Sequence, residues 1–183
     1  MADHPNGVDL AQVQQYVEGV KADPAMAQVR FVANSRWDGG TRADITVSDL
    51  YVGGQSAVPN RHFTVRTDEP GALGGTDQAQ NPAELLAVAL CGCLTAGIAT
   101  NAALFGTELE GCEVSVAIDW NMLGILGLDR SVPTQASGIH YTVKLKGKDK
   151  EALRRSKETL DRKSAVLNTL KNAIPVTTDL IIE

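Results

Sequence analysis

The sequence predicts an α+β fold in which antiparallel sheets wrap around one long, buried helix. Three observations favour this class. Short β-type runs alternate with turn signals between residues 28 and 66, apolar and small residues then run almost unbroken from Leu85 to Phe105, and strands and helices do not alternate regularly after that. A parallel α/β sheet would require such alternation. The 183 residues suffice for one ordinary domain, and we expect residues 1–25 to form a helical extension and residues 26–183 a single domain.

The N-terminal extension is expected to be one amphipathic helix. Residues 9–21 place apolar side chains at spacings of three and four, and Asp23-Pro24 closes the run. Three β-type runs follow at residues 29–32, 43–47 and 63–66, separated by glycine-containing turns. A meander of antiparallel strands is therefore expected.

The start of the long helix is well marked. Asn81 is a good N-cap, Pro82 takes the first helical position, and Glu84 at the third position completes a capping box. Apolar residues occur on every side of this helix, so we expect sheet and other helices to enclose it. We also expect no segment to approach the length of a membrane span, and the protein to be soluble without a membrane partner.

The second half of the chain is expected to continue with strands and then helices. Strands are predicted at residues 112–120 and 139–145, joined by an irregular connection that contains Gly124, Gly127 and Pro133. A charged helix is predicted at residues 148–160 and a short helical segment at 164–170. A terminal strand is predicted at residues 176–182.

Composition and charge argue against several functions. The net charge of −5 is unfavourable for nucleic acid binding, and the first twenty residues have neither the basic start nor the apolar run of a signal peptide, so a cytoplasmic location is expected. The three histidines show no metal-binding spacing, and no glycine-rich nucleotide fingerprint occurs. We therefore expect no metal and no cofactor.

The three cysteines lack the spacing of a disulfide scaffold and are expected to be free thiols. Cys91 and Cys93 lie two positions apart on the predicted helix, so their side chains diverge by roughly 200° and cannot bond to each other. Buried cysteines are common core residues. A reactive thiol would need a cationic partner and a route for substrate, and the local pattern does not choose between the two.

The loop and the long helix resemble the OsmC/Ohr family of thiol peroxidases. The resemblance runs from about residue 28 to the C-terminus, and its motifs are EPGALGGT at 69–76, NPAELL at 81–86, CGCL at 91–94, LEGCEV at 109–114 and SAVLNTL at 164–170. It implies an OsmC-like fold and an intertwined homodimer in which one site takes residues from both chains. Of the two neighbouring thiols, it assigns Cys93 to the peroxidatic position.

The resemblance also implies two residues that act on the thiol. Arg36 matches the arginine that pairs with the thiolate, and Glu84 matches the glutamate that orients it. Arg36 beside Cys93 would favour the thiolate. Arg36 can equally be a solvent-exposed turn residue, and Glu84 is explained as well by helix capping as by orienting an arginine.

One departure from the family pattern matters for function. Ser164 stands at the position of the second cysteine, which would resolve the sulfenic acid as a disulfide. Cys112 is predicted to lie out of disulfide reach of Cys93. The sequence thus predicts a one-cysteine hydroperoxide reductase in oxidative-stress defence, which takes a peroxide and an external thiol.

Two other functions remain open at this point. The first is a non-catalytic protein of the same fold that binds a hydrophobic small molecule at the dimer interface. The second is a structural or interaction module whose cysteines are buried and inert.

Overall fold

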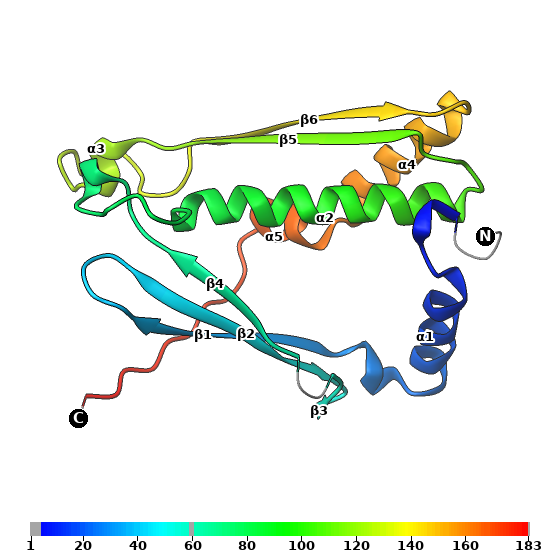
Figure 1. The fold of residues 1–183 in the computed structure, drawn as a ribbon, viewed down its shortest axis with the longest axis horizontal. Helices are drawn as coiled ribbons and strands as arrows, with labels where there is room; N and C mark the ends of the chain where they lie inside the picture. The colour runs from blue at the N-terminus through cyan, green and yellow to red at the C-terminus, as the bar shows by residue number, and fades with distance from the viewer. Residues whose placement is uncertain (1–4, 59–60, 183) are drawn as a thin grey trace. The chain divides into compact units, whose positions relative to one another are not determined.

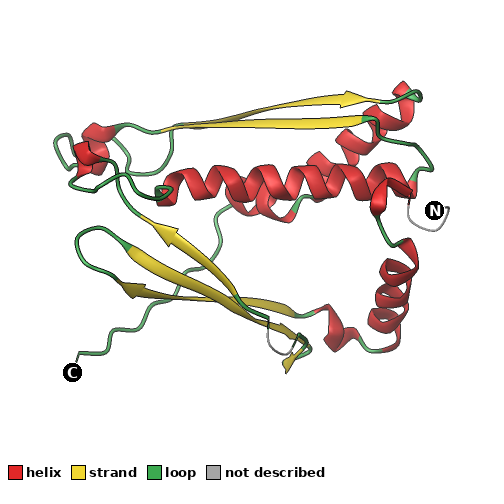
Figure 2. Ribbon diagram, in the orientation of Figure 1, coloured by secondary structure: helices red, strands yellow, loops and turns green. Residues whose placement is uncertain are grey.

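The computed structural model describes residues 5–58 and 61–182 and contains both helices and antiparallel strands (Figures 1 and 2). The predicted α+β class is therefore confirmed. The described residues form two compact units: residues 9–86 make one, and residues 5–8 with 87–182 make the other.

In the unit of residues 9–86, a helix precedes a four-stranded antiparallel sheet. Helix α1 spans Leu10–Ala22, and Asp9 caps it by accepting a hydrogen bond from the backbone N–H of Gln12. Strand β2 is the centre of the sheet and pairs with each of the other strands. The strands are β1 (Val29–Trp37), β2 (Ala43–Val52), β3 (Gln55–Ser56) and β4 (Phe63–Thr67).

In the unit that contains residues 87–182, a long helix packs against a β-hairpin and two further helices. In Figure 1 the hairpin of β5 and β6 runs alongside α2. Leu90, Leu94 and Ile98 of α2 are fully buried, and Leu160 and Leu167 complete this core against the inner face of the hairpin. The elements are α2 (Pro82–Leu104), β5 (Gly111–Asp119), α3 (Met122–Ile125), β6 (Gly138–Lys146), α4 (Lys150–Lys163) and α5 (Ala165–Lys171).

Helix α2 is buried on one face only. Its buried side chains recur every four residues, whereas Val88 and Leu104 are each 57% exposed. The predicted enclosure on all sides is therefore not seen within the single chain. With 23 residues and a mean hydropathy of 1.8, α2 is also long and apolar enough to cross a membrane, so the expectation that no segment approaches a span is wrong. We interpret α2 as the core helix of this fold because its fully buried residues pack on β5, β6, α4 and α5.

Helix α4 packs against α2 on one side and contacts the β5–β6 hairpin on the other. A Cβ on Gly97 of α2 would collide with the Leu160 side chain, so glycine permits the close approach of α2 and α4. On the hairpin side, the Tyr141 hydroxyl donates to an Asp161 carboxylate oxygen at 2.6 Å, and the Lys157 ammonium donates to the other oxygen at 2.6 Å. These contacts fix the C-terminal half of α4, which leads to Ser164.

The main difference from the predicted elements lies at the C-terminus. Residues 176–182 are extended but form no strand, because no described strand pairs with them. Four of their side chains are between 81% and 84% exposed, namely Val176, Leu180, Ile181 and Ile182. A β-type sequence becomes a strand only when another strand supplies hydrogen bonds.

Candidate functional site

The two neighbouring cysteines of α2 face different surroundings, as their spacing predicts. The Cys91 thiol donates to the Val114 carbonyl oxygen of β5 at 3.8 Å, so it faces the hairpin. The Cys93 sulfur lies 3.2 Å from the Ser164 hydroxyl oxygen at the junction of α4 and α5. Cys91 is therefore a packing residue, whereas Cys93 meets a polar side chain.

Ser164 has a defined place in the backbone structure. Its N–H donates to the Leu160 carbonyl at the end of α4, and its hydroxyl oxygen accepts from the Leu167 N–H at 3.2 Å, which caps α5. The residue is 3% exposed. Because the hydroxyl oxygen already accepts one hydrogen bond, its proton is available for the Cys93 sulfur, most favourably when that sulfur is an anion.

A cavity of about 340 Å³ opens beside this pair. It lies between the middle of α2 and the end of α4, and most of its wall is small or apolar. Lys163 is the one charged residue of the lining. The lining consists of Cys93, Ala96, Gly97, Thr100, Asn101, Leu160, Lys163, Ser164 and Ala165. The Cys93 thiol therefore borders a space that a small molecule can enter.

Cys112 differs from Cys93 in its environment. It lies on the inner face of β5 and packs against the buried core. Burial raises the pKa of the Cys112 thiol. A raised thiol pKa disfavours the thiolate, so Cys112 is a poor nucleophile.

The capping role predicted for Glu84 is confirmed. Its carboxylate accepts from the Asn81 backbone N–H at 2.9 Å, and the Asn81 side chain accepts from the Ala83 N–H at 2.6 Å, which together form the capping box. The Asn81 amide also donates to the Glu69 carboxylate at 2.6 Å. The second predicted role of Glu84, orienting an arginine, stays a prediction.

Arg36 belongs to a row of three charged residues across the sheet. It lies on exposed β1 opposite Asp44 of β2, and Arg66 of β4 lies opposite Asp44 on the other side. The Arg66 guanidinium donates to the Asp44 carboxylate at 2.8 Å. This hydrogen bond, with smaller contributions from the charges of Arg66 and Arg36, lowers the pKa of Asp44.

Arg36 and Cys93 thus belong to different compact units. The structure brings Cys93 and Ser164 together, and it brings Arg36 beside Asp44 and Arg66. The meeting of Arg36 with the thiol remains a prediction. Arg66 was not found from the sequence, because its partnership with Asp44 depends on the register of two strands.

A buried carboxylate organises the loop that leads to α2, and the sequence reasoning missed it. Asp68 is 1% exposed and accepts from the hydroxyls of Thr41 at 2.6 Å and Thr76 at 2.5 Å. It also accepts from the backbone N–H groups of Glu69, Thr76 and Gln78. These bonds, that of Thr41 foremost, hold the pKa of Asp68 well below its usual value. The hydrogen bonds of Asp68 therefore fix the start of the loop that leads to the N-cap of α2.

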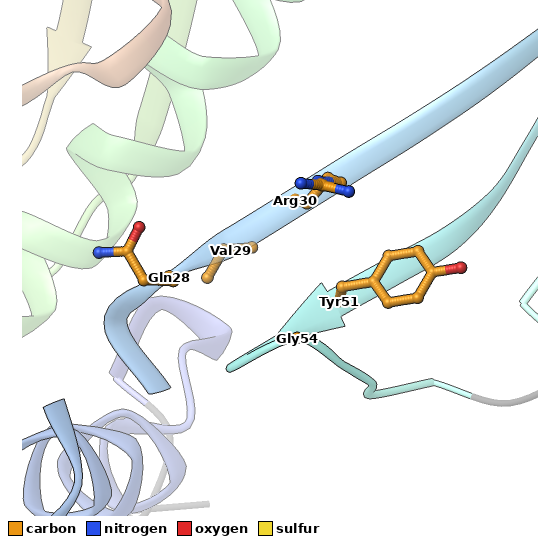
Figure 3. Close-up of a pocket in the computed structure, with 5 residues that line it drawn as sticks. All are labelled: Gln28, Val29, Arg30, Tyr51 and Gly54. Atoms are coloured by element: carbon orange, nitrogen blue, oxygen red, sulfur yellow. The ribbon is translucent and has the colours of Figure 1, made fainter. Parts of the chain in front are cut away.

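A second hollow lies on the sheet unit and has a different character. It measures about 490 Å³ and is lined by Gln28, Val29, Arg30, Tyr51 and Gly54. Figure 3 shows Arg30 and Tyr51 on neighbouring strands, where they are register partners. None of the predicted site residues lines it. In residues 5–58 and 61–182, no three His, Cys, Asp or Glu side chains form a group that could hold a metal ion.

Comparison with known proteins identifies a family and a fold. The family model for OsmC-like protein matches residues 75–179, a segment that contains Glu84, Cys93 and Ser164 but neither Arg36 nor Arg66. No curated protein matches the chain.

Several solved structures share the fold, and two of them are OsmC-family proteins from Legionella and Mycoplasma. The organic hydroperoxide resistance protein OsmC of Legionella pneumophila is 14% identical, with 78% of this chain and 89% of that chain covered and a TM-score of 0.53. An OsmC-like protein of Mycoplasma pneumoniae is 14% identical, with coverages of 79% and 87% and a TM-score of 0.56.

Proposed function

Because the chain belongs to the OsmC-like protein family, we propose that it is a thiol-dependent hydroperoxide reductase with Cys93 as its peroxidatic residue. The observation that carries this proposal is the position of the Cys93 sulfur, 3.2 Å from a buried hydroxyl and beside a cavity that a small molecule can enter. The name of the Legionella neighbour, an organic hydroperoxide resistance protein, supports organic hydroperoxides as the substrate class.

The proposed chemistry begins with attack by the Cys93 thiolate on the outer oxygen of the hydroperoxide. A sulfur–oxygen bond forms, the oxygen–oxygen bond breaks, and the alkoxide leaves with a proton as an alcohol. The Ser164 hydroxyl can donate a hydrogen bond to the thiolate. Cys93 is left as a sulfenic acid.

A guanidinium is proposed as the cationic partner of the thiolate, and the charged row around Asp44 contains two. Arg36 is the residue predicted from the family resemblance, with Glu84 orienting it. Arg66 shares its charged row and pairs with Asp44 through a solvent-accessible salt bridge, which leaves its guanidinium free to exchange partners at little cost. The chain also passes from Arg66 through the Asp68 loop directly to α2. Arg36→Ala and Arg66→Ala, compared for the rate of Cys93 oxidation, decide which one acts.

We further propose that the protein is a homodimer, and two exposed surfaces support this. The extended residues 174–182 carry exposed apolar side chains, and none of the described strands pairs with them. One face of α2 is also exposed and consists of apolar and small residues: Val88, Ala89, Gly92 and Thr95. A second copy would cover both. Light scattering of the full chain and of a variant ending at Ala173 tests this, and a monomeric full chain contradicts it.

The test of the catalytic proposal is consumption of cumene hydroperoxide and hydrogen peroxide with dithiothreitol or dihydrolipoamide as reductant. Turnover is expected in the wild type and in Cys91→Ser, because Cys91 faces the hairpin, and it is expected to be lost in Cys93→Ser. Equal rates in wild type and Cys93→Ser would remove Cys93 from the reaction.

A second candidate function is supported by the lining of the cavity. Ala96, Gly97, Leu160 and Ala165 are apolar or small, so the same space suits a hydrophobic ligand without chemistry. Native mass spectrometry of freshly purified protein would detect such a ligand. A retained ligand together with a thiol that does not react with peroxide would favour this alternative.

A further inference from the structure

Return of Cys93 to its thiol form requires a second sulfur, and the nearest polar side chain cannot supply it. Ser164 lies 3.2 Å from the Cys93 sulfur, but a hydroxyl cannot form the disulfide that would resolve a sulfenic acid. We propose that the cavity beside Cys93 binds the reducing thiol, and that Lys163 selects a small thiol that carries a carboxylate. This inference rests on the proposed peroxidase function and adds the class of its second substrate.

The shape of the cavity suits a small molecule. Its volume of about 340 Å³ is at the lower end of the range for small-molecule sites. Its room comes from the small side chains of Ala96, Gly97 and Ala165. Gly97 packs against the Leu160 side chain without space for a Cβ, so this wall of the cavity is closely packed. The thiol would therefore enter a space that exists before it binds.

The charge of the cavity indicates which thiol fits. Lys163 is the one charged residue of the lining, and its side chain is exposed. In the part of the chain that the structure describes, Lys163 forms no ion pair. The chain as a whole carries a net charge of −5, which disfavours anions elsewhere on its surface. An ammonium at the mouth of an otherwise uncharged cavity therefore favours a thiol with a carboxylate over a neutral or cationic one.

The proposed reduction takes two thiols. The thiolate of the first attacks the Cys93 sulfur, a sulfur–sulfur bond forms, and the sulfur–oxygen bond breaks as hydroxide leaves and becomes water with one proton. A second thiolate then attacks the outer sulfur of this mixed disulfide, and Cys93 leaves as a thiolate. One hydroperoxide and two thiols thus give one alcohol, one water and one disulfide.

The first experiment measures cavity charge without any peroxide chemistry. In a Cys91→Ser background, the thiol at position 93 is reacted with the dianionic reagent 5,5′-dithiobis(2-nitrobenzoate) and with neutral 2,2′-dithiodipyridine, and modification is followed by mass spectrometry. The rate with the dianionic reagent divided by the rate with the neutral reagent should fall about fivefold in Lys163→Gln and further in Lys163→Glu. In Lys163→Arg, which keeps the charge, this ratio should stay near its wild-type value. Lys171→Gln, on the surface of α5, is the matched control. Equal ratios in wild type and Lys163→Glu would overturn the assignment.

The second experiment measures turnover of cumene hydroperoxide with three thiols of similar length: 3-mercaptopropionate, its methyl ester and cysteamine. Each variant is compared with wild type for the same thiol, which cancels the intrinsic reactivity of that thiol. Lys163→Glu should lower kcat/KM for mercaptopropionate about tenfold relative to the ester and raise it for cysteamine. High salt should reduce the difference in kcat/KM between wild type and Lys163→Glu, because salt screens the charge at position 163.

The two proposals fail in different ways. If peroxide produces no sulfenic acid on Cys93 while the reagent ratio still depends on Lys163, the peroxidase function is wrong and the anion preference of the cavity holds. If the sulfenic acid forms but the thiol preference is the same in wild type and Lys163→Glu, only the role of Lys163 is wrong.

Discussion

Replacing Ser164 with cysteine should create a disulfide to Cys93. The Ser164 oxygen and the Cys93 sulfur are 3.2 Å apart, so the two sulfurs need to approach by only about 1 Å to bond. The residues are 71 positions apart in sequence, and closing a loop of that length stabilises a protein by ~4 kcal/mol in the chain-entropy model. The substitution also removes the hydroxyl that caps α5, which costs about 1 kcal/mol.

The two effects separate when the redox state is changed. Oxidised Ser164→Cys should be about 3 kcal/mol more stable than wild type, a rise in Tm of roughly 6–12 °C for a chain of this size. With excess reductant the same variant should be about 1 kcal/mol less stable than wild type, because only the lost cap remains. Thermal unfolding with and without reductant, together with a count of free thiols, measures both.

The control is the double variant Cys93→Ser with Ser164→Cys, which retains the new thiol but has no partner for it. Its Tm should not respond to reductant. The single variant has four cysteines, and two of them should be free after oxidation. Four free thiols in air, with a Tm that does not respond to reductant, would refute the placement of Ser164 beside Cys93.

Three further predictions concern the residues that hold the site in place. Asp68→Asn should destabilise the protein at neutral pH. Because folding lowers the pKa of Asp68, the stabilisation by its carboxylate is complete above the ordinary pKa of 3.8 and is lost as the pH falls below that value. The urea midpoints of variant and wild type should therefore converge below about pH 4. Midpoints that stay equally far apart at low pH would contradict this. Gly97→Ala should lower the free energy of unfolding by about 1–3 kcal/mol, because the new Cβ meets the Leu160 side chain. The control is Gly71→Ala, whose new Cβ meets open space and should change stability by less than about 0.5 kcal/mol. Equal effects of the two substitutions would count against the close packing of α2 and α4. Burial, and then the hydrogen bond to Asp161, raise the pKa of Tyr141 to about 12. In an absorbance titration, the tyrosine ionisation that occurs at the highest pH should therefore disappear in Tyr141→Phe. If it persists, that ionisation does not belong to Tyr141.

The sequence predicts local structure where the signal is local. The capping box of α2 needs only Asn81, Pro82 and Glu84 in order, and the structure confirms it. The hairpin of β5 and β6 shows the alternation that was expected from one buried face. Strands β1 and β2 extend several residues beyond their predicted ends, because the polar residues there are held by pairing and not by burial.

The sequence does not predict features that depend on contacts between distant segments. The Asp68 cluster joins Thr41 to residues of the following loop, and the charged row of Asp44 and Arg66 depends on register. Residues 176–182 have the composition of a strand but pair with none of the strands that the structure describes. The proximity of Cys93 and Ser164 follows from the family resemblance, because helix periodicity alone leaves Cys91 and Cys93 equivalent.

The extended C-terminal segment also bears on how this protein behaves when it is made and stored. Residues 176–182, VTTDLII, combine β-branched and leucine side chains with the single charge of Asp179, a composition typical of segments that seed aggregation when left unpaired. In the single chain these residues are exposed. We therefore expect this exposed segment to promote aggregation when the protein is made and stored.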